Sequence, residues 1–152
     1  MRKKLLLGLT LTTGLTAPAM AEKWHEIGSS EDTVAYADED SIKANGSIVS
    51  MDVFQGFEGG HGENRNVYYT KSSMELDCTG RKARELRIDV FGADHAMLPP
   101  LPIDTSWQAV TDGTFAGVYS KMACDGERSA GVFTDPFSAA DDYWEYMYYY
   151  GE

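Results

Sequence analysis

The stretch from Ser73 to Val90 constrains the fold most, because apolar and polar residues alternate along it on both sides of a tight turn at 79–81. The apolar positions are Met74, Leu76 and Cys78 before the turn and Leu86, Ile88 and Val90 after it. A period of two residues is typical of antiparallel strands with a single buried face. The stretch therefore predicts a β-hairpin in which the buried row of the first arm ends at the thiol of Cys78.

Strands of the same kind are predicted on the N-terminal side of this hairpin. The expected strands cover residues 23–27, 33–37, 47–57 and 66–78. The pair Asn45-Gly46 is the strongest tight-turn signal in the chain. Consecutive antiparallel strands joined by turns form a meander. Residues 93–104 contain three prolines, so we expect a loop that crosses one edge of the sheet.

One helix is predicted after the sheet, starting at Thr111 or Asp112 and ending near Cys124. Its apolar residues follow the spacing of one helix face: Phe115, Val118, Tyr119 and Met122. Trp107 is expected to enter the core just before this helix. The predicted fold class is α+β, with an antiparallel β-meander sheet, a helix packed on one face and one disulfide.

The C-terminal residues differ in composition from the rest of the chain. Residues 125–131 are linker-like, and Asp135-Pro136 favours a helix start. The following segment combines acidic residues with six aromatic ones: Tyr143, Trp144, Tyr146, Tyr148, Tyr149 and Tyr150. Aromatic side chains supply surface to bury, so this tail is interpreted as a short helix that docks on the domain or on a partner. These six residues are the candidate partner-binding residues.

The first 21 residues have the features of a cleavable signal peptide. A basic start is followed by a short apolar run and by an Ala-x-Ala site ending at Ala21. The apolar run is too short to span a bilayer. We expect an exported protein with one α+β domain over 22–125, a tail over 126–152 and no transmembrane segment after cleavage.

Export also bears on the two cysteines, Cys78 and Cys124. In an oxidising compartment, two cysteines favour one disulfide over metal ligands or a catalytic nucleophile. The alternative is a pair of buried, unpaired thiols. Closing a loop between residues 46 positions apart removes about 4 kcal/mol of unfolded-state entropy in the chain model.

Net charge argues against nucleic acid as a partner. The formal net charge is −11, and residues 1–21 contribute three positive and no negative charges, so residues 22–152 carry −14. Such a surface repels phosphate backbones and anionic lipid headgroups.

No catalytic or cofactor-binding pattern stands out. His25, His61 and His95 lack the spacing of a zinc site, and His25 is expected at the surface or at a sheet edge.

The basic residues near the hairpin turn are Arg81, Arg84 and Arg87. Pairing with Glu75, Asp77, Glu85 or Asp89 is the favoured interpretation of these arginines, and an anion-docking patch is the alternative. We predict a protein that is not an enzyme and has neither a metal nor a cofactor.

Between Glu22 and Cys124 the sequence resembles the surface-adhesin protein E-like domains of Gram-negative bacteria. The resemblance is carried mainly by a scaffold motif made of Trp24, Ile27, Tyr36, Asp38, Ser41, Asp77, Arg81, Arg84 and Trp107. Additional matching positions are Ile42, Gly46, Tyr69, Ser72, Cys78, Tyr119 and Cys124. The resemblance implies an antiparallel sheet with a packed helix, a Cys–Cys bond, and an exported adhesin that binds host matrix and serum proteins.

Two functions remain open from the sequence. The first is a non-enzymatic binding protein at the cell surface, recognising a matrix or serum protein through the aromatic tail or through loops 58–64 and 93–104. The second is a periplasmic accessory module that binds a small ligand or an envelope component. A homodimer through edge strands or the tail is also considered.

Overall fold

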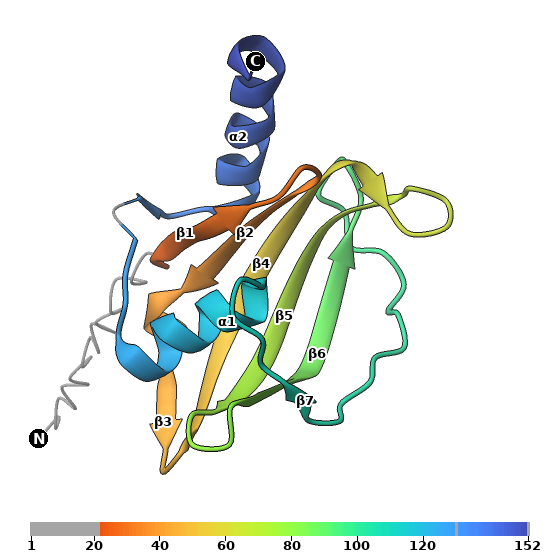
Figure 1. Cartoon of the computed structure of the whole chain (residues 1–152). Helices are drawn as coiled ribbons and strands as arrows, with labels where there is room; N and C mark the ends of the chain where they lie inside the picture. Colours follow the sequence, from red (N-terminus) through yellow and green to blue (C-terminus); the bar gives the residue numbers. More distant parts are fainter. Residues whose placement is uncertain (1–21, 130, 152) are drawn as a thin grey trace, which may run out of the picture.

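The computed structural model describes residues 22–129 and 131–151, so the predicted signal peptide, 1–21, lies outside the described residues. Its centre is one antiparallel sheet in the order β7-β6-β5-β4-β2-β1-β8, with β3 paired to β4 (Figure 1). The strands are β1 (Trp24–Ser29), β2 (Thr33–Asp38), β3 (Lys43–Asn45), β4 (Ile48–His61), β5 (Val67–Asp77), β6 (Lys82–Phe91), β7 (Gln108–Ala109) and β8 (Val132–Phe133). The helical segments are η1 (Glu39–Ser41), α1 (Phe115–Ser120), the π-helical η2 (Lys121–Asp125) and α2 (Pro136–Tyr150).

The predicted hairpin is confirmed as β5 and β6, with one change in register. Ser73 pairs with Arg87 while Met74 pairs with Glu85, so Leu86 is an extra residue on β6. This bulge turns Leu86 out of the buried row, and 43% of its surface is exposed. Its expected place in the core is therefore wrong. Closer to the turn, Ala83 faces the core instead.

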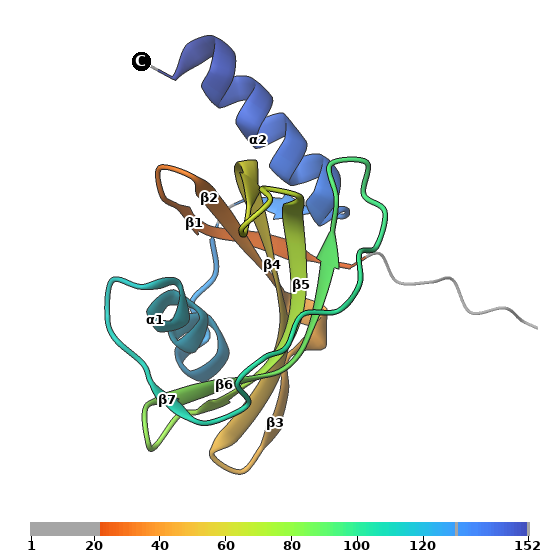
Figure 2. The ribbon, with the colours of Figure 1, turned by 90° about the vertical axis from the view of Figure 1, so that its right-hand side faces the viewer.

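The sheet has an apolar core on each face, which follows from strands buried on both sides. In β2 every residue is buried. On the face of α1 the core includes Met51, Leu76, Tyr119 and Met122. The opposite core forms at the base of α2, and its buried residues are Trp24, Val34, Tyr36, Phe54, Tyr69, Ala139 and Ala140. Figure 2 shows the sheet curving around α1 while α2 rises from the other side and runs past the end of the strands.

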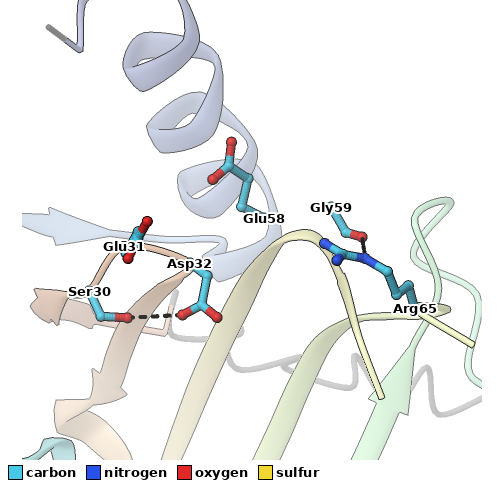
Figure 3. A pocket seen from close by; sticks show the side chains of 6 residues that line it. All are labelled: Ser30, Glu31, Asp32, Glu58, Gly59 and Arg65. Atoms are coloured by element: carbon cyan, nitrogen blue, oxygen red, sulfur yellow. Dashed lines mark hydrogen bonds between the residues drawn. The ribbon is translucent and has the colours of Figure 1, made fainter. Parts of the chain in front are cut away.

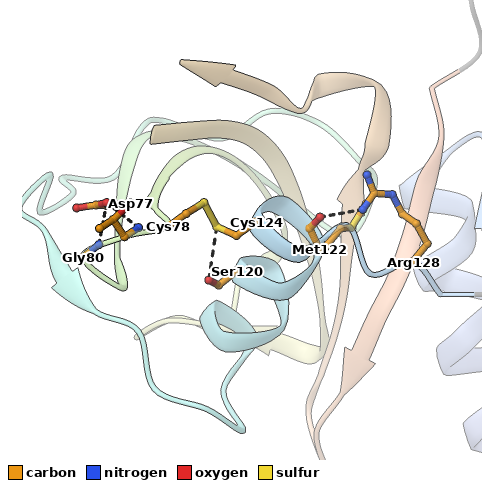
Figure 4. The surroundings of a disulfide bond; sticks show 8 residues. Asp77, Cys78, Gly80, Ser120, Met122, Cys124 and Arg128 are labelled. Carbon is orange, nitrogen blue, oxygen red and sulfur yellow. Dashed lines mark hydrogen bonds between the residues drawn. A yellow bond between two sulfur atoms is a disulfide. The ribbon is translucent and has the colours of Figure 1, made fainter. Parts of the chain in front are cut away.

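The packed helix and the disulfide, both predicted, are confirmed. Helix α1 begins at Thr114, whose Oγ1 accepts a hydrogen bond from the Gly117 N–H at 3.2 Å, so the predicted start at Thr111 or Asp112 is slightly early. The helix continues into η2, where Cys124 is bonded to Cys78 with a Cα–Cα distance of 5.6 Å (Figure 4). The disulfide thereby ties the end of this helical unit to the hairpin turn.

Several residues of the scaffold motif have structural roles at turns. Asp77 accepts hydrogen bonds from the backbone N–H groups of Thr79 and Gly80, at 3.1 and 2.9 Å, and so closes the hairpin turn. Asp38 caps η1 by accepting from the Asp40 N–H at 3.0 Å. The Ser41 hydroxyl accepts from the Asp52 N–H on β4 at 2.8 Å.

The arginines near the turn pair with carboxylates, as the favoured interpretation predicted, although one partner differs. Arg84 donates two hydrogen bonds to Glu75, at 2.9 and 2.7 Å, and its guanidinium lies 4.5 Å from the Trp107 ring centroid. Trp107 is half-buried against Arg84, whereas Val110 is the buried residue in that segment. Arg87 pairs with Asp89 at 2.8 Å. The partner of Arg81 is Asp112, at 2.7 Å, rather than a hairpin residue.

Candidate functional site

The candidate site lies on α2, a fifteen-residue helix with a well-defined start. The carboxylate of Asp135 accepts hydrogen bonds from the backbone N–H groups of Phe137 and Ser138, at 3.1 and 3.4 Å, and Pro136 occupies the first helical turn. Burial alone would raise the pKa of Asp135, but the hydrogen bonds from Ser138 and Phe137 outweigh burial and lower it. The predicted helix start at Asp135-Pro136 is confirmed.

The N-terminal half of α2 is packed against the sheet. The Phe137 ring lies between rings of three strands, with centroid distances of 4.8 Å to Phe54, 5.3 Å to Tyr69 and 5.0 Å to Phe91. Ala140 is fully buried and faces Gly56 on β4. Burial of this apolar surface holds the base of the helix in place.

A polar contact fixes the same region of the helix. The Tyr69 hydroxyl donates a hydrogen bond to Asp141, and His95 Nε2 lies 3.0 Å from the other carboxylate oxygen of Asp141. Burial, and then the neighbouring Asp141, raise the pKa of the Tyr69 hydroxyl. The His95 ring also packs against Phe137, with a centroid distance of 4.8 Å. Tyr69, Asp141 and His95 thus connect β5, α2 and the loop after β6.

The six candidate aromatic residues separate into two groups along α2. Tyr143 and Trp144 are partly buried and pack against the core at the base of the helix. Tyr146, Tyr148, Tyr149 and Tyr150 have exposed fractions between 61% and 82%. The tail is therefore docked on its own domain through its first half, while its second half projects beyond the sheet (Figure 1). Partner binding by these residues stays a prediction.

A shallow groove runs along one side of the projecting half. It has a volume of about 460 Å³ and is lined by Asp142, Glu145, Tyr146, Tyr149 and Tyr150. These positions follow the i, i+3, i+4, i+7, i+8 spacing of a single helix face. Their order places the carboxylates toward the sheet and the rings toward the end of the helix.

The loop between β1 and β2, the end of β4 and the loop between β4 and β5 form a second concave region (Figure 3). This open cleft of about 540 Å³ is lined by Ser30, Glu31, Asp32, Glu58, Gly59 and Arg65. Ser30 donates to Asp32 at 3.2 Å, and Arg65 Nε donates to the Gly59 carbonyl at 3.0 Å. The predicted binding loop 58–64 contributes to this cleft, although residues 58–61 continue β4. The loop 93–104 contains the exposed Met97 and Leu101.

The three histidines lie in separate surroundings. His25 is only 4% exposed, so the expected surface position is wrong. Its Nε2 lies 3.0 Å from Glu39 and its Nδ1 lies 3.2 Å from the Ser129 carbonyl, because η1 and the segment after η2 cover this part of β1. His61 stacks on Phe57 with a centroid distance of 4.9 Å. Within the described ranges, no group of three His, Cys, Asp or Glu side chains could hold a metal ion.

Sequence reasoning missed the contacts that position α2. Asp141 is 72 residues from Tyr69 and 46 from His95 along the chain, and no local pattern links them. The close approach of α2 at Gly56 could not be predicted either, because a glycine within a strand has several explanations.

In the part of the chain that the structure describes, no helix combines the length and apolarity needed to span a bilayer.

Comparison with solved structures supports the fold. Two solved structures of Haemophilus influenzae protein E, the first of them its crystal form II, have TM-scores of 0.51 and 0.50, each with 15% sequence identity. The alignments cover 78% and 81% of this chain and 98% and 92% of the protein E chains. No curated protein sequence matches.

The sequence itself matches a known family over most of its length. The family described as surface-adhesin protein E matches residues 24–125, from β1 to the end of η2. Helix α2 lies beyond this match. The chain belongs to the surface-adhesin protein E family.

Proposed function

We propose that this chain is an exported, non-enzymatic adhesin that binds an extracellular protein, of the matrix or serum type, through the projecting half of α2. Membership of a surface-adhesin family supports the general activity. The observation that carries the proposed contact surface is the exposure of Tyr146, Tyr148, Tyr149 and Tyr150 on a helix whose base is packed.

Exposed tyrosines on a rigid support are well suited to protein recognition. A tyrosine ring buries a large area on binding and loses little conformational freedom, and its hydroxyl can form a hydrogen bond. The packed rings around Phe137 and the contact of Asp141 with Tyr69 hold the helix before binding. A preorganised surface avoids part of the entropic penalty of association.

Replacing the four exposed tyrosines by glutamine tests the contact surface, since glutamine retains good helix propensity. Residues 22–152 and this variant would be titrated against immobilised matrix and serum proteins by surface plasmon resonance. A partner of the parent protein should bind the variant more than about tenfold more weakly. A matched control carries Leu86→Gln, Met97→Gln and Leu101→Gln, which remove exposed apolar side chains elsewhere. Equal binding by the tyrosine variant would refute the assignment to α2.

A further inference from the structure

We propose that the groove on α2 receives a basic, arginine-rich segment of the protein partner. This inference rests on the proposed function and adds the chemical class of the partner. The groove residues are Asp142, Glu145, Tyr146, Tyr149 and Tyr150.

Helix α2 itself contributes charges of one sign to the groove. After Arg128 the sequence contains no lysine, arginine or histidine but five acidic residues. Among residues 22–129 and 131–151, no ion pair involves Asp142 or Glu145. Both side chains are exposed, as is the helix end beyond them. A cationic partner would meet attraction from this surface and an anionic partner repulsion.

The rings next to these carboxylates favour arginine among the cations. Tyr146 and Tyr150 have ring centroids 5.3 Å apart, one turn along the helix. A guanidinium can stack on an aromatic face while its N–H groups donate to a carboxylate, whereas an ammonium is a strongly hydrated point charge. The chain contains this arrangement elsewhere: Arg84 lies 4.5 Å from the Trp107 ring centroid and donates to Glu75 at 2.7 Å.

The dimensions of the groove suggest how the basic residues are spaced. From Asp142 to Tyr150 the helix rises about 12 Å, at about 1.5 Å per residue. An extended peptide covers this length with about four residues, because it advances about 3.3 Å per residue. Arginines at alternate positions would therefore lie about one helical turn apart and reach successive groove residues.

A second copy of this chain is a poorer occupant. Residues 22–152 carry a net charge of −14. Two copies would each bring this charge to the contact, and a parallel pair of α2 helices would also place Asp142 and Glu145 beside the same carboxylates of the other copy. Like charges in contact oppose association. Anionic lipid surfaces are disfavoured for the same reason.

The test uses residues 22–152 and a short peptide of alternating arginine and glycine, with lysine–glycine and glutamate–glycine peptides for comparison. Calorimetric titration should give the tightest binding to the arginine peptide and none to the glutamate peptide. Asp142→Asn with Glu145→Gln should weaken arginine-peptide binding by roughly 1.5- to 5-fold per charge. The control is Asp125→Asn with Glu127→Gln, which removes two exposed carboxylates at the end of η2. Raising salt from about 0.05 M to about 0.5 M should also weaken binding.

Each other outcome overturns a definite part of the proposal. An equal loss of affinity for the arginine peptide in the α2 variant and in the control variant would indicate attraction by net charge alone. It would refute the groove as the binding site. Self-association through the tyrosines, or attachment to neutral lipid vesicles, without arginine-peptide binding would refute the stated partner. A further outcome is that the four-tyrosine variant loses a protein partner whose affinity for the parent changes neither with salt nor with Asp142→Asn. That result would support the proposed function and refute only the arginine-rich nature of the partner segment. If that variant keeps its protein partner, the contact surface fails as well.

Discussion

Gly56 allows α2 to approach the sheet, and replacing it by alanine should loosen the helix. A Cβ at Gly56 would lie 2.8 Å from the Cβ of Ala140 and 3.4 Å from Cγ1 of Val34. Non-bonded carbon atoms normally stay about 3.5–4.0 Å apart. Ala140 is fully buried, so the contact is relieved only by moving the helix or the strand.

The size of the effect follows from two opposing contributions. Overpacking of this kind destabilises by about 1–3 kcal/mol. Alanine is better than glycine within a strand by about 0.5–1 kcal/mol, and the φ angle of Gly56 lies outside the left-handed region. Gly56→Ala should therefore lower the free energy of unfolding by up to roughly 2.5 kcal/mol. Urea unfolding, followed by circular dichroism and tryptophan fluorescence, measures this change.

A double-mutant cycle isolates the contact. Ala140→Gly alone should destabilise by about 2 kcal/mol, through lower helix propensity and the loss of a buried methyl group. Combined with Gly56→Ala it removes the clash, so the double variant should be more stable than the sum of the single effects by about 1–3 kcal/mol. Additive effects of the two substitutions would refute the close approach of α2 to β4.

Two further predictions concern the other face and the sheet edge. Cys78→Ser with Cys124→Ser should lower the free energy of unfolding by about 2–4 kcal/mol, measured in urea without reductant, and a loss below about 1 kcal/mol would contradict the role of the bond. Hydrogen bonds from His25, and then from Arg128, lower the pKa of Glu39. Its stabilisation is present above the unfolded-state pKa of about 4.3 and is lost as the pH falls through the lower folded-state pKa. The parent should therefore lose stability relative to Glu39→Gln below about pH 4, and parallel pH profiles of urea unfolding would contradict this.

The sequence predicted the parts of the fold that depend on local periodicity. The hairpin of β5 and β6 and the single disulfide follow from alternation and from cysteine number. The bulge at Leu86 escaped prediction, because a strand pattern does not reveal where pairing slips by one residue. Trp24 and Ile27 are three positions apart on β1, so strand alternation places them on opposite faces of the sheet, where each packs against a different core.

The candidate site was only partly predictable. A helix with six aromatic residues is visible in the sequence, because Asp135-Pro136 and the aromatic composition are local signals. Which rings are buried depends on contacts from distant strands, such as that between Asp141 and Tyr69. For the same reason the burial of His25 beneath η1 was missed. Tertiary contacts of this kind leave no periodic trace.

Protease treatment of intact cells distinguishes an adhesin that acts outside the cell from a periplasmic protein. The chain and a known periplasmic protein would be followed by immunoblotting before and after treatment, with lysed cells as the control for susceptibility. We expect this chain to be cleaved, starting at the projecting end of α2, while the periplasmic protein stays intact. If both proteins survive in intact cells and both are cleaved after lysis, the adhesin proposal is contradicted.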